Sequence, residues 1–219
     1  MSYNLARKDH QWMPANKAAS ANHLLNVLSD YIKESSFKRL LNQIVTAQAS
    51  DNFVTVAVLS ELAGEGRSFF ISALALAYMR YLDGQVLIVD ATNQTKRRSL
   101  FLECVLAEKR TNKGGLARVD LITTRSLENV DHDSVDFQLG AFISDLKPQY
   151  ELILVDTVPL AYEGRDCIDP FIVARHADRA ILLTSPASIR QDNLRKTVRD
   201  LERCRIKLLG TAFNNGAPL

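Results

Sequence analysis

The sequence predicts a doubly wound α/β fold with a mostly parallel sheet. Six short aliphatic runs alternate with longer segments of helical periodicity, and most of these runs are apolar throughout. Continuous apolar runs are typical of strands that are buried on both faces of a parallel sheet. Successive runs begin roughly 27 to 33 residues apart, which is the length of a strand–helix–strand unit.

The first 50 residues predict a helical extension that precedes this sheet. Residues 1–17 show no periodicity, and we expect them to fray. Apolar side chains recur at three- and four-residue spacing over residues 18–32, which indicates an amphipathic helix. A second helix is expected over residues 37–47. We expect the first helix to pack on the sheet edge and residues 51–219 to form the main domain.

The main domain is expected to alternate strands with helices. The strands are expected over residues 53–59, 85–89, 118–123, 151–155, 179–184 and 206–213. The helices are expected over residues 68–82, 97–108, 134–147, 170–176 and 190–204. Strands that alternate with helices in this way indicate strand–helix–strand units and a parallel sheet.

Composition excludes several classes of protein. The chain has 219 residues, is 47% hydrophobic and 24% charged, and carries a formal net charge of +2. These are ordinary globular values, and the balanced charge gives no reason to expect nucleic acid as the partner. The three cysteines show no CxxC pairing, so we expect no disulfide framework or zinc site. The longest apolar stretch, residues 69–79, is too short to span a bilayer, and we expect a cytoplasmic protein.

A glycine-rich loop, SELAGEGRS over residues 60–68, joins the first strand to the helix that follows it. Glycine lets backbone N–H groups converge without obstruction by Cβ atoms, and the N-terminus of a helix adds partial positive charge. Gly64 and Gly66 therefore predict a phosphate cradle, with Ser68 placed to hold Mg²⁺.

Two aspartates end neighbouring strands of the expected sheet. Asp90 follows the run Val-Leu-Ile-Val, and Asp156 follows the run Leu-Ile-Leu-Val. Carboxylates at the carboxyl ends of parallel strands point into the crevice where ligands bind. A single aspartate there is more often a helix cap or turn residue. Together with the glycine-rich loop, however, the two aspartates favour a nucleotide-phosphate site.

The segments SELAGEGRS, LIVDAT and LILVDTVP resemble the Walker A, Walker A′ and Walker B motifs of bacterial tyrosine kinases. Those kinases are the exopolysaccharide branch of the MinD/ParA-type P-loop ATPases, and the resemblance covers roughly residues 34–215. It implies that ATP or ADP binds with Mg²⁺. Asp156 would hold the metal through water beside Ser68, Arg67 would neutralise charge, and Asp90 would orient or deprotonate the attacking group. The implied nucleotide-binding residues are Gly64, Glu65, Gly66, Arg67, Ser68, Phe69 and, facing the adenine, Asn214.

The chain departs from the family at positions that carry chemistry. Arg67 stands in place of the P-loop lysine, and its planar fork is not equivalent to a compact ammonium. Phe69 replaces a small hydroxyl residue, which removes a side-chain contact to the α-phosphate. In Walker A′, Thr92 and Gln94 replace an aspartate and an arginine. The sequence also carries no C-terminal tyrosine cluster, and its last tyrosine is Tyr162.

These departures predict a regulatory nucleotide-binding protein with impaired catalysis. An active ATPase or kinase that acts on a partner remains open, as does a scaffold that binds no nucleotide. The resemblance implies that the partner is the cytoplasmic segment of a membrane polysaccharide co-polymerase, which would hold the protein at the inner membrane. The oligomerisation pattern ExxRxxR is broken at Ser35, Lys38 and Leu41, so we expect a monomer or a homodimer rather than a closed ring.

Overall fold

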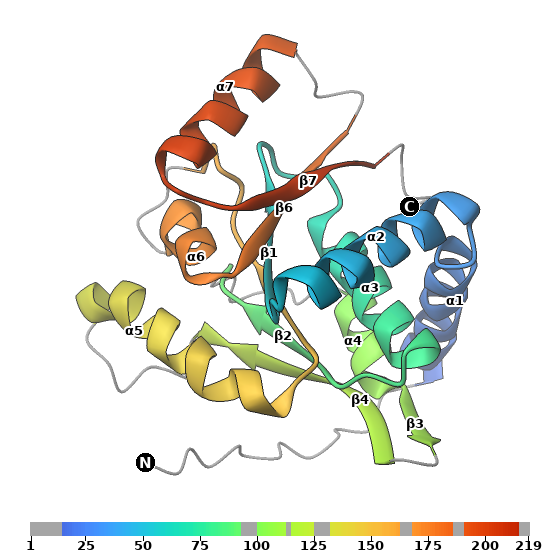
Figure 1. Ribbon diagram of the computed structural model, residues 1–219. Helices are drawn as coiled ribbons and strands as arrows, with labels where there is room; N and C mark the ends of the chain where they lie inside the picture. Colours follow the sequence, from blue (N-terminus) through green and yellow to red (C-terminus); the bar gives the residue numbers. More distant parts are fainter. Residues whose placement is uncertain are drawn as a thin grey trace.

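The computed structural model describes residues 15–92, 100–112, 115–124, 132–162, 168–185 and 191–214. Within these residues, seven strands form one sheet in the order β3-β4-β2-β5-β1-β6-β7 (Figure 1). The strands are β1 Thr55–Ser60, β2 Val86–Asp90, β3 Lys109–Asn112, β4 Gly115–Thr123, β5 Leu152–Asp156, β6 Arg179–Thr184 and β7 Leu208–Phe213. Every pairing is parallel except that of β3 with β4. The prediction of a mostly parallel α/β sheet is confirmed.

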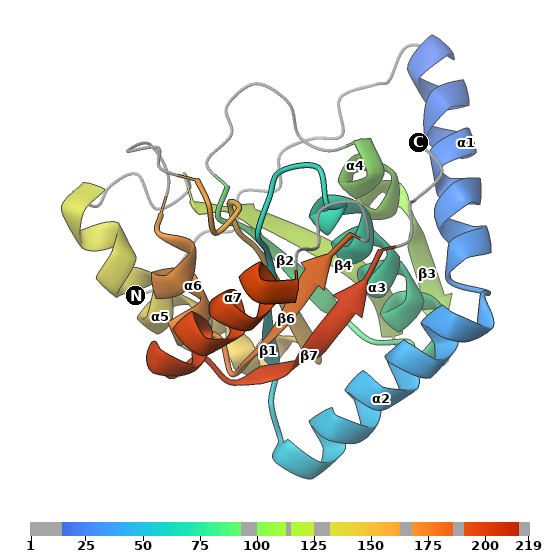
Figure 2. The same ribbon diagram turned by 90° about the horizontal axis from the view of Figure 1, so that it is seen from above.

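Helices cover both faces of the sheet (Figure 2). They are α1 Ala15–Tyr31, α2 Ser35–Asp51, α3 Arg67–Tyr81, α4 Leu100–Ala107, α5 His132–Leu146, α6 Pro170–His176 and α7 Gln191–Arg203, with a 3-10 turn at Lys147–Gln149. Alternate residues of the central strands belong to two hydrophobic clusters: Val56 and Val58 of β1 lie with α1 to α4, and Ala57 and Leu59 lie with α5 to α7. Burial on both faces explains why these strands are apolar throughout.

The antiparallel edge strand β3 was not expected from the sequence. The segment Lys109–Asn112 reads KRTN, a short polar stretch without the apolar pattern that marks the inner strands. Polar residues are typical of edge strands, which have only one neighbour to pair with. The helix expected over residues 97–108 ends at Ala107, and residues 93–99, which include Gln94, lie outside the described part of the chain.

Helix α1 packs on other helices rather than on the sheet edge. It lies against α3 and α4, which themselves cover one face of the sheet (Figure 2). The expectation that it packs on the sheet edge is therefore wrong. Leu28 of α1 and Ile32, which follows the helix, are buried in the same cluster as the side chains of α3. The helix begins at Ala15, so residues 15–17 are helical instead of frayed.

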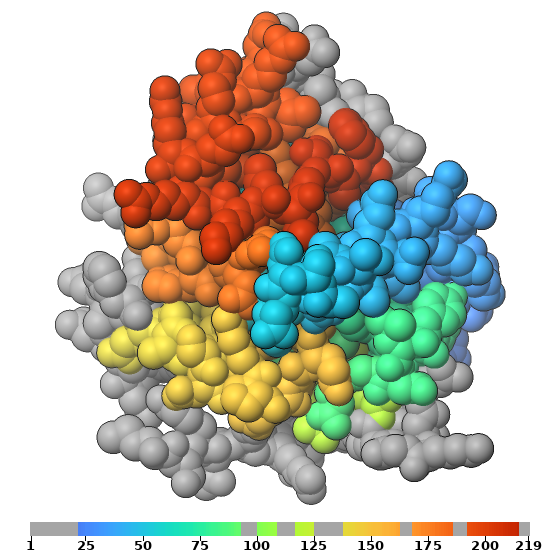
Figure 3. Space-filling model, viewed as in Figure 1, coloured from blue at the N-terminus to red at the C-terminus, as the bar shows by residue number. Residues whose placement is uncertain are grey.

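Helix α2 is fixed to the main domain by buried apolar residues and by one glutamine. Gln48 accepts a hydrogen bond from the Tyr78 hydroxyl at 2.8 Å and donates one to the Glu151 carbonyl oxygen at 2.7 Å. In the space-filling view, α2, in blue and cyan, lies on the surface between the red C-terminal part of the described chain and the green segment at the end of α3 (Figure 3). Among the described residues, no helix is both long and apolar enough to cross a membrane.

Candidate functional site

The sheet topology brings the predicted motifs together at one edge. Strands β2, β5 and β1 are neighbours, and Asp156 of β5 is in register with Asp90 of β2 and Val58 of β1. Because all three strands are parallel, their carboxyl ends meet at the same edge of the sheet. The loop after β1 therefore lies beside both aspartates.

The loop between β1 and α3 has the backbone that a phosphate cradle needs. Gly64 and Gly66 have φ angles of 84° and 89°, in the left-handed region that glycine adopts without strain. Gly66 is the N-cap of α3, and no side chain caps that end. The first N–H groups of a helix have no intrahelical acceptor, so an anion at this position can accept hydrogen bonds from them. A Cβ atom at Gly66 would also clash with the Asn214 side-chain amide.

Ser68 and Asp156 form the polar centre of the site. The Ser68 hydroxyl donates to Asp156 Oδ2 at 3.1 Å, linking the first turn of α3 to the end of β5. Asp156 is only 2% exposed. Burial raises its pKa to about 6; the neighbouring Arg67 favours the charged form, whereas Asp90 opposes it.

Arg67 turns into the site instead of toward solvent. Its Nη1 donates to the Ser60 hydroxyl oxygen, and its Nε lies 3.6 Å from Asp156 Oδ1. Only 12% of the side chain is exposed. Burial lowers the pKa of Arg67 from its ordinary value, although Asp156 and Glu65 favour its charge. Both Arg67 Nε and Asp156 Oδ1 are buried without a hydrogen-bond partner, and the two atoms face each other as an ion pair.

Glu65, between the two glycines, is buried rather than open to a ligand. Its Oε2 accepts from the backbone N–H of Leu62 at 2.9 Å. Its Oε1 accepts from the Ser185 N–H at 3.3 Å and from the Thr184 hydroxyl at 3.4 Å. The carboxylate thus connects the loop to the end of β6. Sequence reasoning missed this role, because the contacts to residues 184 and 185 cross more than a hundred positions.

Asp90 and Asn214 are each engaged by neighbours in the site. Thr92 donates twice to Asp90 Oδ1, from its N–H at 3.0 Å and from its hydroxyl at 2.6 Å. The Asn214 amide donates to the Glu65 carbonyl oxygen at 3.0 Å, so the end of β7 touches the loop. Asp90, Asp156, Gly64, Glu65, Gly66, Arg67, Ser68 and Asn214 therefore lie on or beside the loop and the strand ends next to it.

Phe69 is the exception among the predicted site residues. Its side chain is buried, and its ring meets the rings of Tyr31 and Phe101 edge to face, with centroids 4.9 and 5.0 Å apart. The side chain thus packs between α1 and α4, away from the loop. Only its backbone N–H, in the first turn of α3, is left to contribute to a phosphate site.

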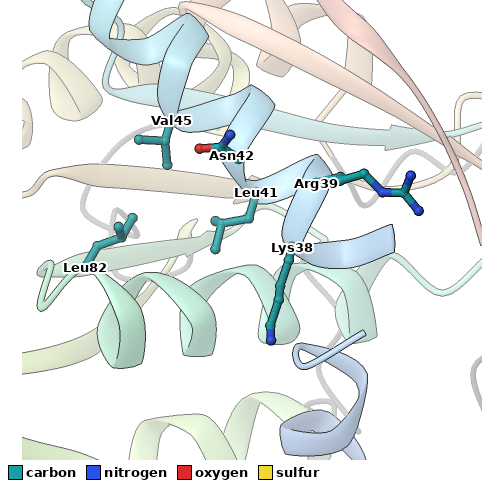
Figure 4. Close-up of a pocket in the computed structure, with 6 residues that line it drawn as sticks. All are labelled: Lys38, Arg39, Leu41, Asn42, Val45 and Leu82. Atoms are coloured by element: carbon teal, nitrogen blue, oxygen red, sulfur yellow. The ribbon is translucent and has the colours of Figure 1, made fainter. Parts of the chain in front are cut away.

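The pocket shown in Figure 4 lies elsewhere. It has a volume of about 410 Å³ and is lined by Lys38, Arg39, Leu41, Asn42, Val45 and Leu82. Leu82 follows the last residue of α3, whereas the loop precedes its first residue, so the two ends are separated by about 20 Å of helix. This pocket is not the phosphate site.

No family model matches the chain, and no curated protein matches it in sequence. Solved structures do. The BceF tyrosine kinase domain matches 93% of this chain and 90% of its own with a TM-score of 0.60 at 17% identity. The kinase domain of Escherichia coli tyrosine kinase ETK matches 96% of this chain and 83% of its own with a TM-score of 0.57 at 17% identity. The cell division ATPase MinD of Pyrococcus furiosus matches 74% of this chain and 71% of its own with a TM-score of 0.50 at 19% identity.

These likenesses establish the fold. The chain has the doubly wound fold of the MinD-like P-loop ATPases. More particularly, two structures that match more than nine tenths of it are tyrosine kinase domains of the bacterial family that its motifs resemble.

Proposed function

We propose that the protein binds an adenine nucleotide at the loop between β1 and α3 and acts as a regulator rather than an efficient kinase. The observation that carries this proposal is the uncapped N-terminus of α3, entered through two left-handed glycines, beside the Ser68–Asp156 pair. N–H groups that lack an intrahelical acceptor at a helix N-terminus suit a phosphate group.

The residues present fit the phosphates of a nucleotide. Arg67 places a positive guanidinium beside the loop, and the planar guanidinium group matches phosphate oxygens with several N–H donors. Gly64 and Gly66 let the loop backbone take left-handed φ angles that residues with a Cβ atom rarely adopt. Asn214, bonded to the Glu65 carbonyl oxygen, is the residue that the family resemblance would place at the adenine.

The engaged carboxylates support a regulatory role. Asp90 would orient or deprotonate an attacking group, yet one of its oxygens already accepts two hydrogen bonds from Thr92. Arg67 pairs with Asp156 and Ser60, whereas phosphoryl transfer depends on charged groups positioned on the transferring phosphate. An active ATPase or kinase that acts on a partner is the second candidate, because the Ser68–Asp156 hydrogen bond is intact.

The partner proposal rests on the sequence resemblance. We propose that the nucleotide-bound protein docks on the cytoplasmic segment of a membrane polysaccharide co-polymerase and so acts at the inner membrane from the cytoplasm. A nucleotide can regulate such an assembly only if it binds one assembly state more tightly than another.

Calorimetric titration with ATP and with ADP tests the nucleotide proposal, in the wild type and in two matched glycine variants. Gly66→Ala places a Cβ atom against Asn214 at a left-handed φ and is expected to abolish binding. Gly84→Ala meets its nearest atoms at 3.7 Å, an ordinary contact, and is expected to bind like the wild type. Absence of nucleotide binding by the wild type, or equal binding by Gly66→Ala, would refute the proposal.

A further inference from the structure

The Arg67 guanidinium lies beside Asp156, the carboxylate that the family resemblance would assign to the metal ion. Ser68 can donate to Asp156 and still offer a lone pair to a cation. Asp156 Oδ1, however, the oxygen without a hydrogen bond, faces the Arg67 guanidinium at 3.6 Å from Nε. A water molecule bound to a cation would have to donate a hydrogen bond to the same oxygen that already faces the buried positive charge of Arg67. The residues present therefore do not fit Mg²⁺ well.

The other carboxylates of the site also have partners within the chain. Asp90 Oδ1 accepts from Thr92 twice. Glu65 accepts from the backbone N–H groups of Leu62 and Ser185. Carboxylate oxygens and water are the ligands that Mg²⁺ prefers. Here, carboxylate oxygens of Asp90 and Glu65 already accept hydrogen bonds from donors of the protein.

We infer that Arg67 replaces the divalent cation of this site, so that the protein binds nucleotide without Mg²⁺. The inference rests on the proposed function and adds the identity of the countercharge. The guanidinium pairs with Asp156 through Nε and with the Ser60 hydroxyl through Nη1, and its remaining N–H groups would donate to a phosphate oxygen. A lysine could not do this, because its ammonium is a compact point charge on a flexible stem.

Titration of a fluorescent ADP analogue in excess Mg²⁺ and in excess EDTA tests the inference. For the wild type we expect dissociation constants that agree within about threefold in the two buffers. For Arg67→Lys we expect binding at least about tenfold weaker in EDTA than in Mg²⁺, because the site then needs the cation. Arg199→Lys, on the exposed surface of α7, is the matched control and should behave like the wild type.

Electron paramagnetic resonance of Mn²⁺ with ADP gives a readout that is independent of affinity. After subtraction of the signal of ADP and Mn²⁺ without protein, the wild type should immobilise no further Mn²⁺, whereas Arg67→Lys should. Wild-type binding that falls tenfold or more in EDTA would overturn the inference and leave the proposed function standing. Binding that is independent of Mg²⁺ in both wild type and Arg67→Lys would overturn the role of Arg67. Absence of wild-type binding in both buffers would refute the proposed function, and this inference with it.

Discussion

Asp178 holds the beginning of β1, and its replacement by asparagine should destabilise the fold measurably. Its Oδ2 accepts from the backbone N–H groups of Val54 and Thr55 at 3.0 and 2.9 Å, and its Oδ1 accepts from Lys147 Nζ at 2.6 Å. The amide oxygen of the substituted side chain would keep the two backbone bonds as neutral bonds, at a loss of about 1 kcal/mol each. The partly exposed ion pair adds up to about 1 kcal/mol. We therefore predict that Asp178→Asn lowers the free energy of unfolding by about 2–3 kcal/mol.

Urea unfolding followed by circular dichroism measures this loss, and thermal unfolding should show a midpoint about 4–12 °C lower for a chain of this size. Asp30→Asn is the matched control. Asp30 pairs with Lys33 at 2.9 Å, but the two side chains are 77% and 62% exposed. We expect that control to change stability by less than about 0.5 kcal/mol. Equal losses in the two variants would refute the reasoning from the partly buried backbone contacts of Asp178.

The pH dependence supplies a second check on Asp178. Burial alone would raise its pKa, but the bonds from Lys147, Thr55 and Val54 outweigh burial and hold the pKa below its ordinary value. A carboxyl that ionises more readily when folded stabilises the protein above its unfolded pKa of about 3.9. This stabilisation is lost as the pH falls through the folded pKa. The stability difference between wild type and Asp178→Asn should thus be constant near neutral pH and shrink below about pH 4.

Four further predictions concern the site and the assembly. Arg67→Ala should weaken nucleotide binding by about 1–3 kcal/mol in a calorimetric titration, the range for a charge-assisted contact. Phe69→Ala should lower the free energy of unfolding in urea by about 3–5 kcal/mol, because the Phe69 ring is buried between the rings of Tyr31 and Phe101. The same variant should leave nucleotide affinity nearly unchanged. Intact-mass measurement after incubation with Mg-ATP should show no phosphate on tyrosine, because Thr92 engages Asp90; a stoichiometric gain would contradict this. Light scattering with and without Mg-ATP should show a monomer or a homodimer, and a stable octamer would contradict that expectation.

The elements that could be predicted from the sequence are those with a strong buried pattern. Strand β6 and helix α6 have the bounds that the sequence predicts, because β6 is apolar on both faces and Pro170 begins the helix after its N-cap Asp169. Strand β3 could not be predicted, because its four polar residues pair with a single neighbour at the sheet edge.

The candidate site likewise has residues that sequence patterns could place and residues that they could not. Asp90 and Asp156 could be placed from the predicted topology alone, because the carboxyl ends of parallel strands lie at the same edge of the sheet. The directions of the Arg67 and Glu65 side chains could not, because their partners lie on other strands and strand ends. The direction of the Phe69 side chain could not be predicted either, because the motif counts its position in the loop, whereas in the structure its ring belongs to the core.

The packing of the Phe69 ring bears on which truncated fragments of the chain can keep the fold. The ring that follows Ser68 rests on Tyr31, the last residue of α1, and Tyr31 in turn contacts Phe37 of α2. A fragment that begins at residue 51 would keep every motif residue, yet it would expose one side of this aromatic stack. Helix α3 would then lose part of the hydrophobic cluster that packs it against α1 and α2. We therefore expect a stably folded fragment of this chain to need both α1 and α2.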